Sequence, residues 1–273
     1  SIETIELAKI TVSDNTLEVS ARQDTLNVHL AYGGDSANRG NIFLTGNLER
    51  IEEKIRTGID ILPSSVYING EKWSLPKSSI GLNGDTIEID SFEINSGSQK
   101  IWADGKISEK TDTLAVGLER FDISILERLL KSDIGIKGKL TGNMHLLSPL
   151  KSNEIFVDML CDSTFLAGEP LGTLALGTRW NDDLMSYDIS VSNDLEGMKN
   201  LDINARFSPS SRYLNAEMDL DRLQIKHAEP FLKDVFSRMS GYASGKIVAE
   251  GPVNMLDISS EGTKLEDAGL TVA

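Results

Sequence analysis

Apolar and polar residues alternate along many short segments of this chain, and this alternation limits its possible folds more than any other feature. The segments are Leu26–Tyr32, Ile87–Asp90, Asp112–Leu118, Tyr187–Val191, Leu201–Phe207 and Ala216–Leu220. Successive side chains of a β-strand point to opposite faces, so we expect strands with one aliphatic and one polar face. Turn sequences such as Asn69-Gly70 and Asn83-Gly84-Asp85 punctuate the segments. The pattern predicts an all-β chain organised as a long meander.

A second feature is an internal repeat at an offset of roughly a hundred residues. Its first copy begins at Leu118-Glu119-Arg120-Phe121-Asp122-Ile123 and its second at Leu220-Asp221-Arg222-Leu223-Gln224-Ile225. In each copy an amphipathic stretch follows, and then a predicted strand. That strand contains Gly138-Lys139-Leu140 in the first copy and Gly245-Lys246-Ile247 in the second. We interpret residues 1–273 as one continuous β-repeat region with units at approximately 118–146 and 220–253.

The amphipathic stretches predict one short helix in each copy. Ser124-Ile125-Leu126-Glu127 has the form of a capping box, and the second copy has a proline, Pro230, where the first helical residue tolerates one. The apolar residues of these expected helices are Leu126, Leu129, Leu130, Phe231, Leu232, Val235, Phe236 and Met239. A further segment, 47–57, fits either a helix or a strand.

Composition excludes several classes of protein. The formal net charge is -15, and the Lys and Arg residues are scattered singly among carboxylates, so nucleic acid is not expected as a partner. Cys161 is the only cysteine, which rules out an intrachain disulfide and suggests a small core residue. The chain begins and ends in mid-pattern, and we expect it to be a piece of a longer protein.

Residues that would support catalysis or metal binding are sparse in the sequence. His29, His145 and His227 lie far apart without other ligands at metal-binding spacing, so we expect them to be exposed or satisfied polar residues. Carboxylates such as Glu88 and Asp90 alternate on what should be the solvated face. These observations predict neither an enzyme, nor a metal site, nor a cofactor, although bound lipid or detergent is compatible with an aliphatic surface.

Three segments carry a resemblance to a known family. They are Pro63–Leu75, Thr86–Ile94 and Ile101–Ser108, supported by Phe121–Ser124, Gly138–Gly142 and the stretch from Gly241 to Gly251. From about Pro63 onward the chain resembles the periplasmic β-repeat region of the TamB (translocation and assembly module inner-membrane subunit) and AsmA-like family, of the Bacteroidetes type. The resemblance covers most of the chain, and its motifs are structural and degenerate.

This resemblance implies an elongated, curved sheet of taco or half-barrel type with a hydrophobic trough. It implies a parent protein anchored in the inner membrane of a Gram-negative bacterium and reaching across the periplasm to an Omp85-family outer-membrane barrel, similar to TamA. The implied role is outer-membrane biogenesis, with phospholipid or nascent outer-membrane protein as the guest. The family has no catalytic motif to carry over.

From the residues alone, the aliphatic face has two possible uses. It could line an open trough that shelters a guest, or it could be the packed core of a closed β-sandwich. By alternation, the residues expected on this face are Leu26, Val28, Leu30, Ile87, Ile89, Leu114, Val116, Leu118, Leu140, Ile189, Val191, Ile203, Phe207, Met218 and Leu220. The corresponding alternatives in function are a structural β-solenoid or adhesin-type surface module and, less favoured by the residues, a carbohydrate-active enzyme.

Overall fold

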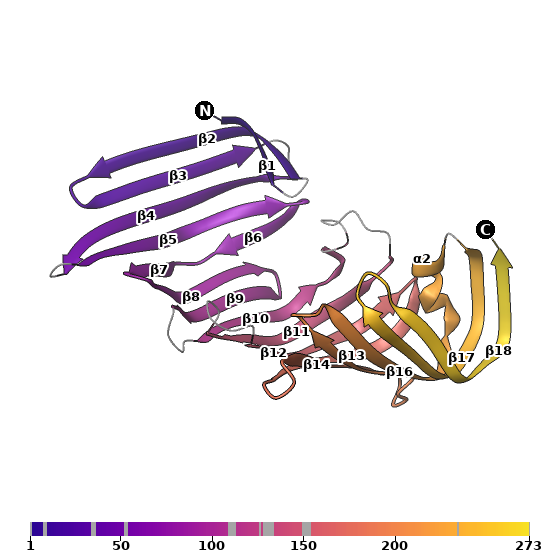
Figure 1. The fold of residues 1–273 in the computed structure, drawn as a ribbon. Coiled ribbons are helices and arrows are strands. Elements are labelled where there is room, and N and C mark those ends of the chain that lie inside the picture. Colours follow the sequence, from indigo (N-terminus) through magenta and orange to yellow (C-terminus); the bar gives the residue numbers. More distant parts are fainter. Residues whose placement is uncertain are drawn as a thin grey trace. The chain divides into compact units, whose positions relative to one another are not determined.

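The computed structural model describes residues 2–7, 10–33, 37–51, 54–108, 113–125, 127, 134–148, 154–233 and 235–272. It separates into two compact units (Figure 1). The first comprises Ser1–Arg120 with His145–Glu154, and the second comprises Phe121–Met144 with Ile155–Ala273. Each unit is built on antiparallel strands.

The sheet of the first unit runs in chain order. Its strands are β1 (Ile2–Leu7), β2 (Ile10–Arg22), β3 (Thr25–Gly33), β4 (Arg39–Ile51), β5 (Lys54–Ile68), β6 (Glu71–Leu75), β7 (Ser78–Asn83), β8 (Thr86–Ser96), β9 (Gln99–Ile107) and β10 (Thr113–Asp122). The short strands β6 and β7 share their partners: β5 pairs with β6 near its C-terminal end and with β7 near its middle. Among the other strands, each pairs with the next along the chain.

The second unit continues the same pattern. Its strands are β11 (Lys137–Leu147), β12 (Glu154–Leu166), β13 (Glu169–Asn181), β14 (Ser186–Asp194), β15 (Leu201–Ser208), β16 (Tyr213–Gln224), β17 (Phe236–Pro252) and β18 (Asp257–Val272). From β12 to β18 every strand pairs antiparallel with its successor. A 3₁₀ turn, η1 (Ile225–Ala228), and a one-turn helix, α2 (Glu229–Leu232), lie between β16 and β17.

The predicted all-β fold with short helices is confirmed. Among the described residues, strands in extensive contact are hydrogen-bonded neighbours of the same sheet, and only η1 and α2 pack on a sheet from outside it. Within each unit the described strands are therefore joined edge to edge, each to its hydrogen-bonded neighbours. The ambiguous segment 47–57 is a strand hairpin, since Asn47 pairs with Gly58 and Leu48 with Thr57 across β4 and β5.

The predicted helix in the second repeat copy is too long. Helical backbone ends at Leu232, Val235 follows in a turn, and Phe236 and Met239 belong to β17. The spacing of these apolar residues suits a helix, but pairing of Met239 with Leu270 of β18 commits the segment to the sheet. Pairing between strands distant in the sequence thus determines the structure here, although the local spacing of apolar residues fits a helix. Phe231 is 66% exposed, so α2 does not lay its apolar residues on the sheet as expected.

In the first copy, Ser124, Ile125 and Glu127 have helical backbone. Leu126, Leu129 and Leu130 of that predicted helix lie outside the described residues. Glu127 Oε1 accepts hydrogen bonds from the backbone N–H groups of Ile134 and Gly135, at 2.7 and 2.6 Å. This carboxylate therefore fastens the helical turn to the entry of β11.

The two copies of the repeat share an unusual backbone position. Arg120 and Arg222 occupy equivalent places and both have positive φ, at 48° and 51°. A non-glycine residue rarely adopts this left-handed conformation. Two residues later the chain leaves the strand for the helical turn, and Ile123 and Ile225 are buried in the two copies. The repeat thus encodes a bend as well as a pattern of side chains.

Gly172 tests how closely the strands approach one another. It has φ +83°, and an added Cβ would lie 2.0 Å from the backbone oxygen of Asp194. We expect Gly172→Ala to lower the free energy of unfolding in urea by about 2–4 kcal/mol, the sum of backbone strain and overpacking. Gly168→Ala is the matched control, because Gly168 has φ +81° with no atom within 4 Å of the added Cβ. Gly168→Ala should lower the free energy of unfolding by only about 1–2 kcal/mol. Equal decreases in the two variants would contradict the close approach of β13 and β14.

Candidate functional site: the aliphatic face

Strand register brings one aliphatic row together in the second unit. Directly opposed residues of antiparallel neighbours point to the same face of a sheet. The opposed pairs run from strand to strand without a break, and the residues of this row are Met159, Leu176, Val191, Ile203, Met218 and Ile247. We call this set the central row; it crosses β12 to β17.

Further pairs widen the same face on both sides of the central row. On one side, Ile189 opposes Ala205 and Tyr187 opposes Phe207; on the other, Leu201 opposes Leu220. The predicted residues of the second unit therefore share one face: Ile189, Val191, Ile203, Phe207, Met218 and Leu220. Leu140 lies two residues from both Gly138 and Gly142, so all three positions point to the same face of β11. A Cβ atom added at Gly138 would meet Cys161 Sγ, and one added at Gly142 would meet Met159 Cγ. Leu140 therefore faces the same side of the sheet as Met159.

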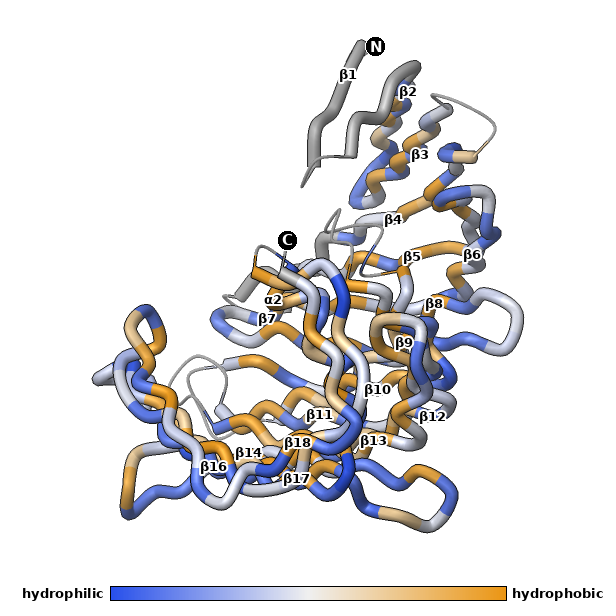
Figure 2. Tube along the Cα trace, turned by 90° about the vertical axis from the view of Figure 1, so that its right-hand side faces the viewer, coloured by the Kyte–Doolittle hydropathy of each residue, from blue (hydrophilic) through white to orange (hydrophobic). Residues whose placement is uncertain are grey.

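The first unit has an equivalent row. It consists of Leu26, Gly46, Ile59, Ile80, Ile89, Gly105 and Leu114, on β3, β4, β5, β7, β8, β9 and β10. The other predicted residues of this unit flank that row two or four positions along their strands, so they point to the same face: Val28, Leu30, Ile87, Val116 and Leu118. The short orange segments interleaved with blue along the strands in Figure 2 are this alternation.

None of the fifteen predicted residues is fully buried. Leu26 is 43% exposed, and the others are partly buried. Residues in the core of a closed sandwich would be covered by a second sheet, and most would be almost inaccessible. The aliphatic face is therefore partly open to its surroundings.

The opposite face of each sheet is polar. In the second unit it carries cross-strand ion pairs such as Arg206–Asp188 at 2.8 Å and Lys246–Glu217 at 2.5 Å. Hydrogen bonds from Asn181 and Arg206 lower the pKa of Asp188, against a smaller opposing effect of burial. Exposed pairs of this kind contribute at most about 1 kcal/mol each. Their main effect is to keep one side of a thin sheet hydrated.

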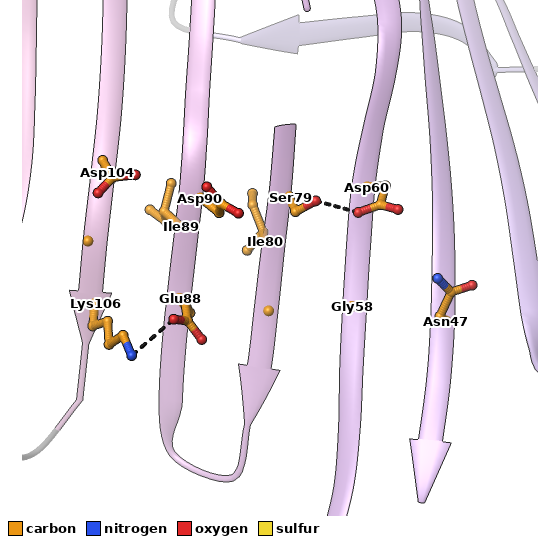
Figure 3. A pocket seen from close by; sticks show the side chains of 12 residues that line it. Asn47, Gly58, Asp60, Ser79, Ile80, Glu88, Ile89, Asp90, Asp104 and Lys106 are labelled. Carbon is orange, nitrogen blue, oxygen red and sulfur yellow. Dashed lines mark hydrogen bonds and ion pairs between the residues drawn. The ribbon is translucent and has the colours of Figure 1, made fainter. Parts of the chain in front are cut away.

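A polar hollow of about 570 Å³ lies over β4 to β9 in the first unit (Figure 3). Its side chains satisfy one another or the backbone. Ser79 Oγ donates to Asp60 Oδ1 at 2.5 Å, Lys106 pairs with Glu88 at 3.0 Å, and Asp104 accepts a hydrogen bond from the Ser91 N–H. No group of metal ligands occurs among the residues that the structure describes. We therefore interpret this hollow as part of the hydrated face.

At one end of the aliphatic face of the second unit, η1 packs on the sheet. Ile225 is buried there with Met239 and Ala243, and Leu220 and Phe236 pack against this cluster. The turn covers the end of the face, while the side chains of the central row stay partly exposed. The helical insertion thus limits the length of the exposed surface.

The three histidines differ more than the sequence suggested. His29 is partly exposed, and hydrogen bonds with Asn41 and Glu18 raise its pKa. His145 is exposed. His227, however, is only 6% exposed, and hydrogen bonds with the backbone of Glu169, Gln224 and Pro170 oppose the larger, lowering effect of burial on its pKa. An exposed position is thus wrong for His227, because η1 buries this residue.

Sequence reasoning missed several residues of the aliphatic face. Met159, Leu176 and Ile247 complete the central row, although each lies in an alternating segment that could have been interpreted in the same way. Cys161 is buried, as predicted, and burial raises the pKa of its thiol. The buried position of His227 could have been found by aligning the repeat copies, since Ile125 is its equivalent.

Comparison of the chain with models of protein families, with curated proteins and with solved structures found no match. Within the part of the chain that the structure describes, no helix is long and apolar enough to span a bilayer. Evidence on function therefore comes from the geometry of the sheets and from the sequence.

The pKa of His227 gives a test of its position. Burial lowers this pKa below the ordinary value of 6.5. The unfolded chain then binds the proton more readily, so the free energy of unfolding should fall as the pH drops below about 6.5. His227→Ile removes this contribution, and its loss of stability between pH about 7.5 and about 5.5 should be smaller than that of the wild type. Equal losses in urea titrations of the two proteins would show that His227 is hydrated.

Proposed function

We propose that this chain is a non-enzymatic module that shelters an extended apolar guest on its aliphatic face. The observation that carries the proposal is the central row of the second unit: six aliphatic side chains in register across six strands, none of them fully buried. A continuous row of partly exposed apolar side chains on a sheet favours a partner that covers it. A guest lying along the row would cross several strands.

The chemistry of the face suits a guest without a fixed pose. Aromatic residues make up only 6% of the chain, and the row is built from Leu, Ile, Val and Met. Each methylene group transferred from water to such a surface contributes about 0.8 kcal/mol. An acyl chain covering several of these residues would therefore gain several kcal/mol without a specific polar contact. Such binding permits the guest to slide.

The family resemblance gives this proposal its cellular setting. We propose that the chain is a periplasmic part of a TamB-like outer-membrane biogenesis factor whose parent is anchored in the inner membrane. Its guest would be phospholipid or nascent outer-membrane β-strands, passed toward an Omp85-family barrel. The resemblance in the segments from Pro63 onward and the antiparallel sheets with one aliphatic face support this placement.

A charge on the central row tests the proposal. Ile203→Asp places a carboxylate in the middle of the row, and Asn204→Asp places the same group on the opposite, hydrated face one residue away. We expect Ile203→Asp to reduce binding of phospholipid at least about tenfold, because the acyl chain would have to desolvate the charge. Asn204→Asp should bind as the wild type does. Native mass spectrometry after incubation with phospholipid vesicles measures the bound fraction.

Folding of both variants is checked by circular dichroism and urea unfolding. A wild-type protein that takes up neither phospholipid nor detergent would overturn the proposal. So would an Ile203→Asp chain that unfolds while Asn204→Asp stays folded, because the row would then be a packed core that needs its apolar side chain for stability.

A further inference from the structure

Three turns lie together at one end of the sheet of the second unit. They follow β13, β15 and β17 and comprise residues 182–185, 209–212 and 253–256. The turns of an antiparallel meander alternate between its two ends, so turns after every second strand share an end. The Val253 N–H donates to the backbone oxygen of Arg212 at 3.0 Å and ties two of these turns together. We call the three turns the turn end.

The turn end exposes large apolar side chains. They are Leu184, Met185, Val253 and Met255, each between 39% and 75% exposed. Turns are usually built from Gly, Pro, Asn, Asp and Ser, and these four positions lie outside the strands, so the alternation of the sheet does not require apolar residues there. A partner that removed these side chains from water would gain apolar burial.

A row of aromatic side chains borders the turn end. Trp180 opposes Tyr187, and Tyr187 opposes Phe207, so the row crosses β13, β14 and β15. It belongs to the aliphatic face, because Tyr187 lies two residues from Ile189 on the same strand. The rings of Trp180 and Tyr187 meet edge to face, with their centroids 4.9 Å apart. Aromatic residues are only 6% of the chain, and three of them adjoin one another here.

Two aromatic side chains at this border have a hydrogen-bonded polar atom. Trp180 Nε1 donates to Asp182 Oδ1 at 2.9 Å, and the Tyr213 hydroxyl donates to Glu250 Oε1 at 2.8 Å. Tyr213 directly follows one of the turns and is 38% exposed. Tryptophan and tyrosine, with an apolar body and a polar edge, favour the boundary between lipid and water. The turn end thus combines apolar tips with amphipathic aromatic rings.

The opposite end of the same sheet has exposed apolar side chains without this border. Met198 and Phe231 are 56% and 66% exposed there. Among the described strand pairs from β12 to β18, no two aromatic residues oppose each other at that end. Met198 therefore provides an exposed methionine outside the aromatic border.

The charges of the turn end disfavour an anionic partner. Its charged residues are Asp182, Asp183 and Arg212, and Glu250 and Asp257 flank it. Attraction to anionic lipids depends on clustered Lys and Arg residues, whereas carboxylates are in excess here. The apolar tips stand on separate turns among polar residues, so they do not form the continuous, closely packed core of a protein–protein interface. These features fit a fluid surface without net charge.

We propose that the turn end docks on the surface of a phospholipid bilayer without net charge. The apolar tips enter the boundary between headgroups and acyl chains to a depth of about 5–10 Å, and Trp180 and Tyr213 lie at the level of the headgroups. This docking goes beyond the proposed function, because it does not require that a lipid leave the bilayer. The aromatic row joins the docked end to the aliphatic face.

Flotation of the protein with phosphatidylcholine vesicles measures docking. We expect the wild type to float with these vesicles to the same extent at low and high sodium chloride concentration, because apolar insertion is not screened by salt. Adding phosphatidylglycerol to the vesicles should not strengthen docking. In the floated protein, bromine-labelled acyl chains should quench the fluorescence of the wild type but not that of Trp180→Phe, which keeps Trp73 and Trp102 of the first unit.

Two variants and one control assign docking to the turn end. Met185→Asp and Met255→Asp should each weaken vesicle binding at least about tenfold, equivalent to about 1.4 kcal/mol, because a carboxylate would have to leave water. Met185 has φ +48°, a conformation that aspartate tolerates. Met198→Asp makes the same replacement at the opposite end and should dock as the wild type does. All three side chains are exposed, so folding should be retained; circular dichroism checks this.

Four outcomes would each overturn the docking proposal. They are no flotation of the wild type, stronger docking on phosphatidylglycerol vesicles that salt abolishes, equal weakening by Met198→Asp and Met255→Asp, and self-association that Met255→Asp abolishes in a protein that does not float. The last result would assign the turn end to a second copy of the chain.

The variant Ile203→Asp separates docking from the sheltering role. It should float with vesicles as the wild type does and should lose the phospholipid that the wild type retains after the vesicles are removed. A wild type that floats but retains no phospholipid would contradict sheltering alone. A wild type that retains phospholipid but does not float would contradict docking alone.

Discussion

In-register antiparallel pairing is the interaction on which the rest of this structure depends. A shift of one residue between two strands would move every aliphatic side chain of one strand to the hydrated face. The observed pairs, such as Val191 with Ile203 and Ile203 with Met218, instead keep like residues opposite one another over many strands. Register therefore turns the local alternation of each strand into a continuous surface.

The local pattern of the sequence was sufficient to predict the strands and their faces. Alternation in Tyr187–Val191 and Leu201–Phe207 identified side chains that the register places on one face. The prediction failed where the spacing of apolar residues in one segment fits both a helix and a strand. Residues Phe231–Met239 suit a helix, and only the distant strand β18 makes Phe236–Met239 a strand. Sequence alone also left the open and closed forms of the face undecided, because both forms require the same alternation.

The helical insertions of the two repeat copies share a backbone geometry but bury different side chains. Both copies bend at an arginine with positive φ and bury a residue five positions later. In the first copy this residue is Ile125 and in the second it is His227. The geometry is common to both and serves the fold, whereas the chemistry of the side chain differs. Comparison of the two copies therefore separates the backbone geometry that the repeat specifies from the side chains in which its copies differ.

The central claim is that the aliphatic face remains accessible to an apolar guest while the protein is folded. Methyl NMR with a spin-labelled fatty acid measures this accessibility directly. We predict strong attenuation of the methyl signals of Val191, Ile203, Met218 and Ile247, and weak attenuation of those of Ile225 and Met239, which are buried together where η1 meets the sheet. Uniformly weak attenuation across both groups would contradict the claim, because the face would then be closed to a guest.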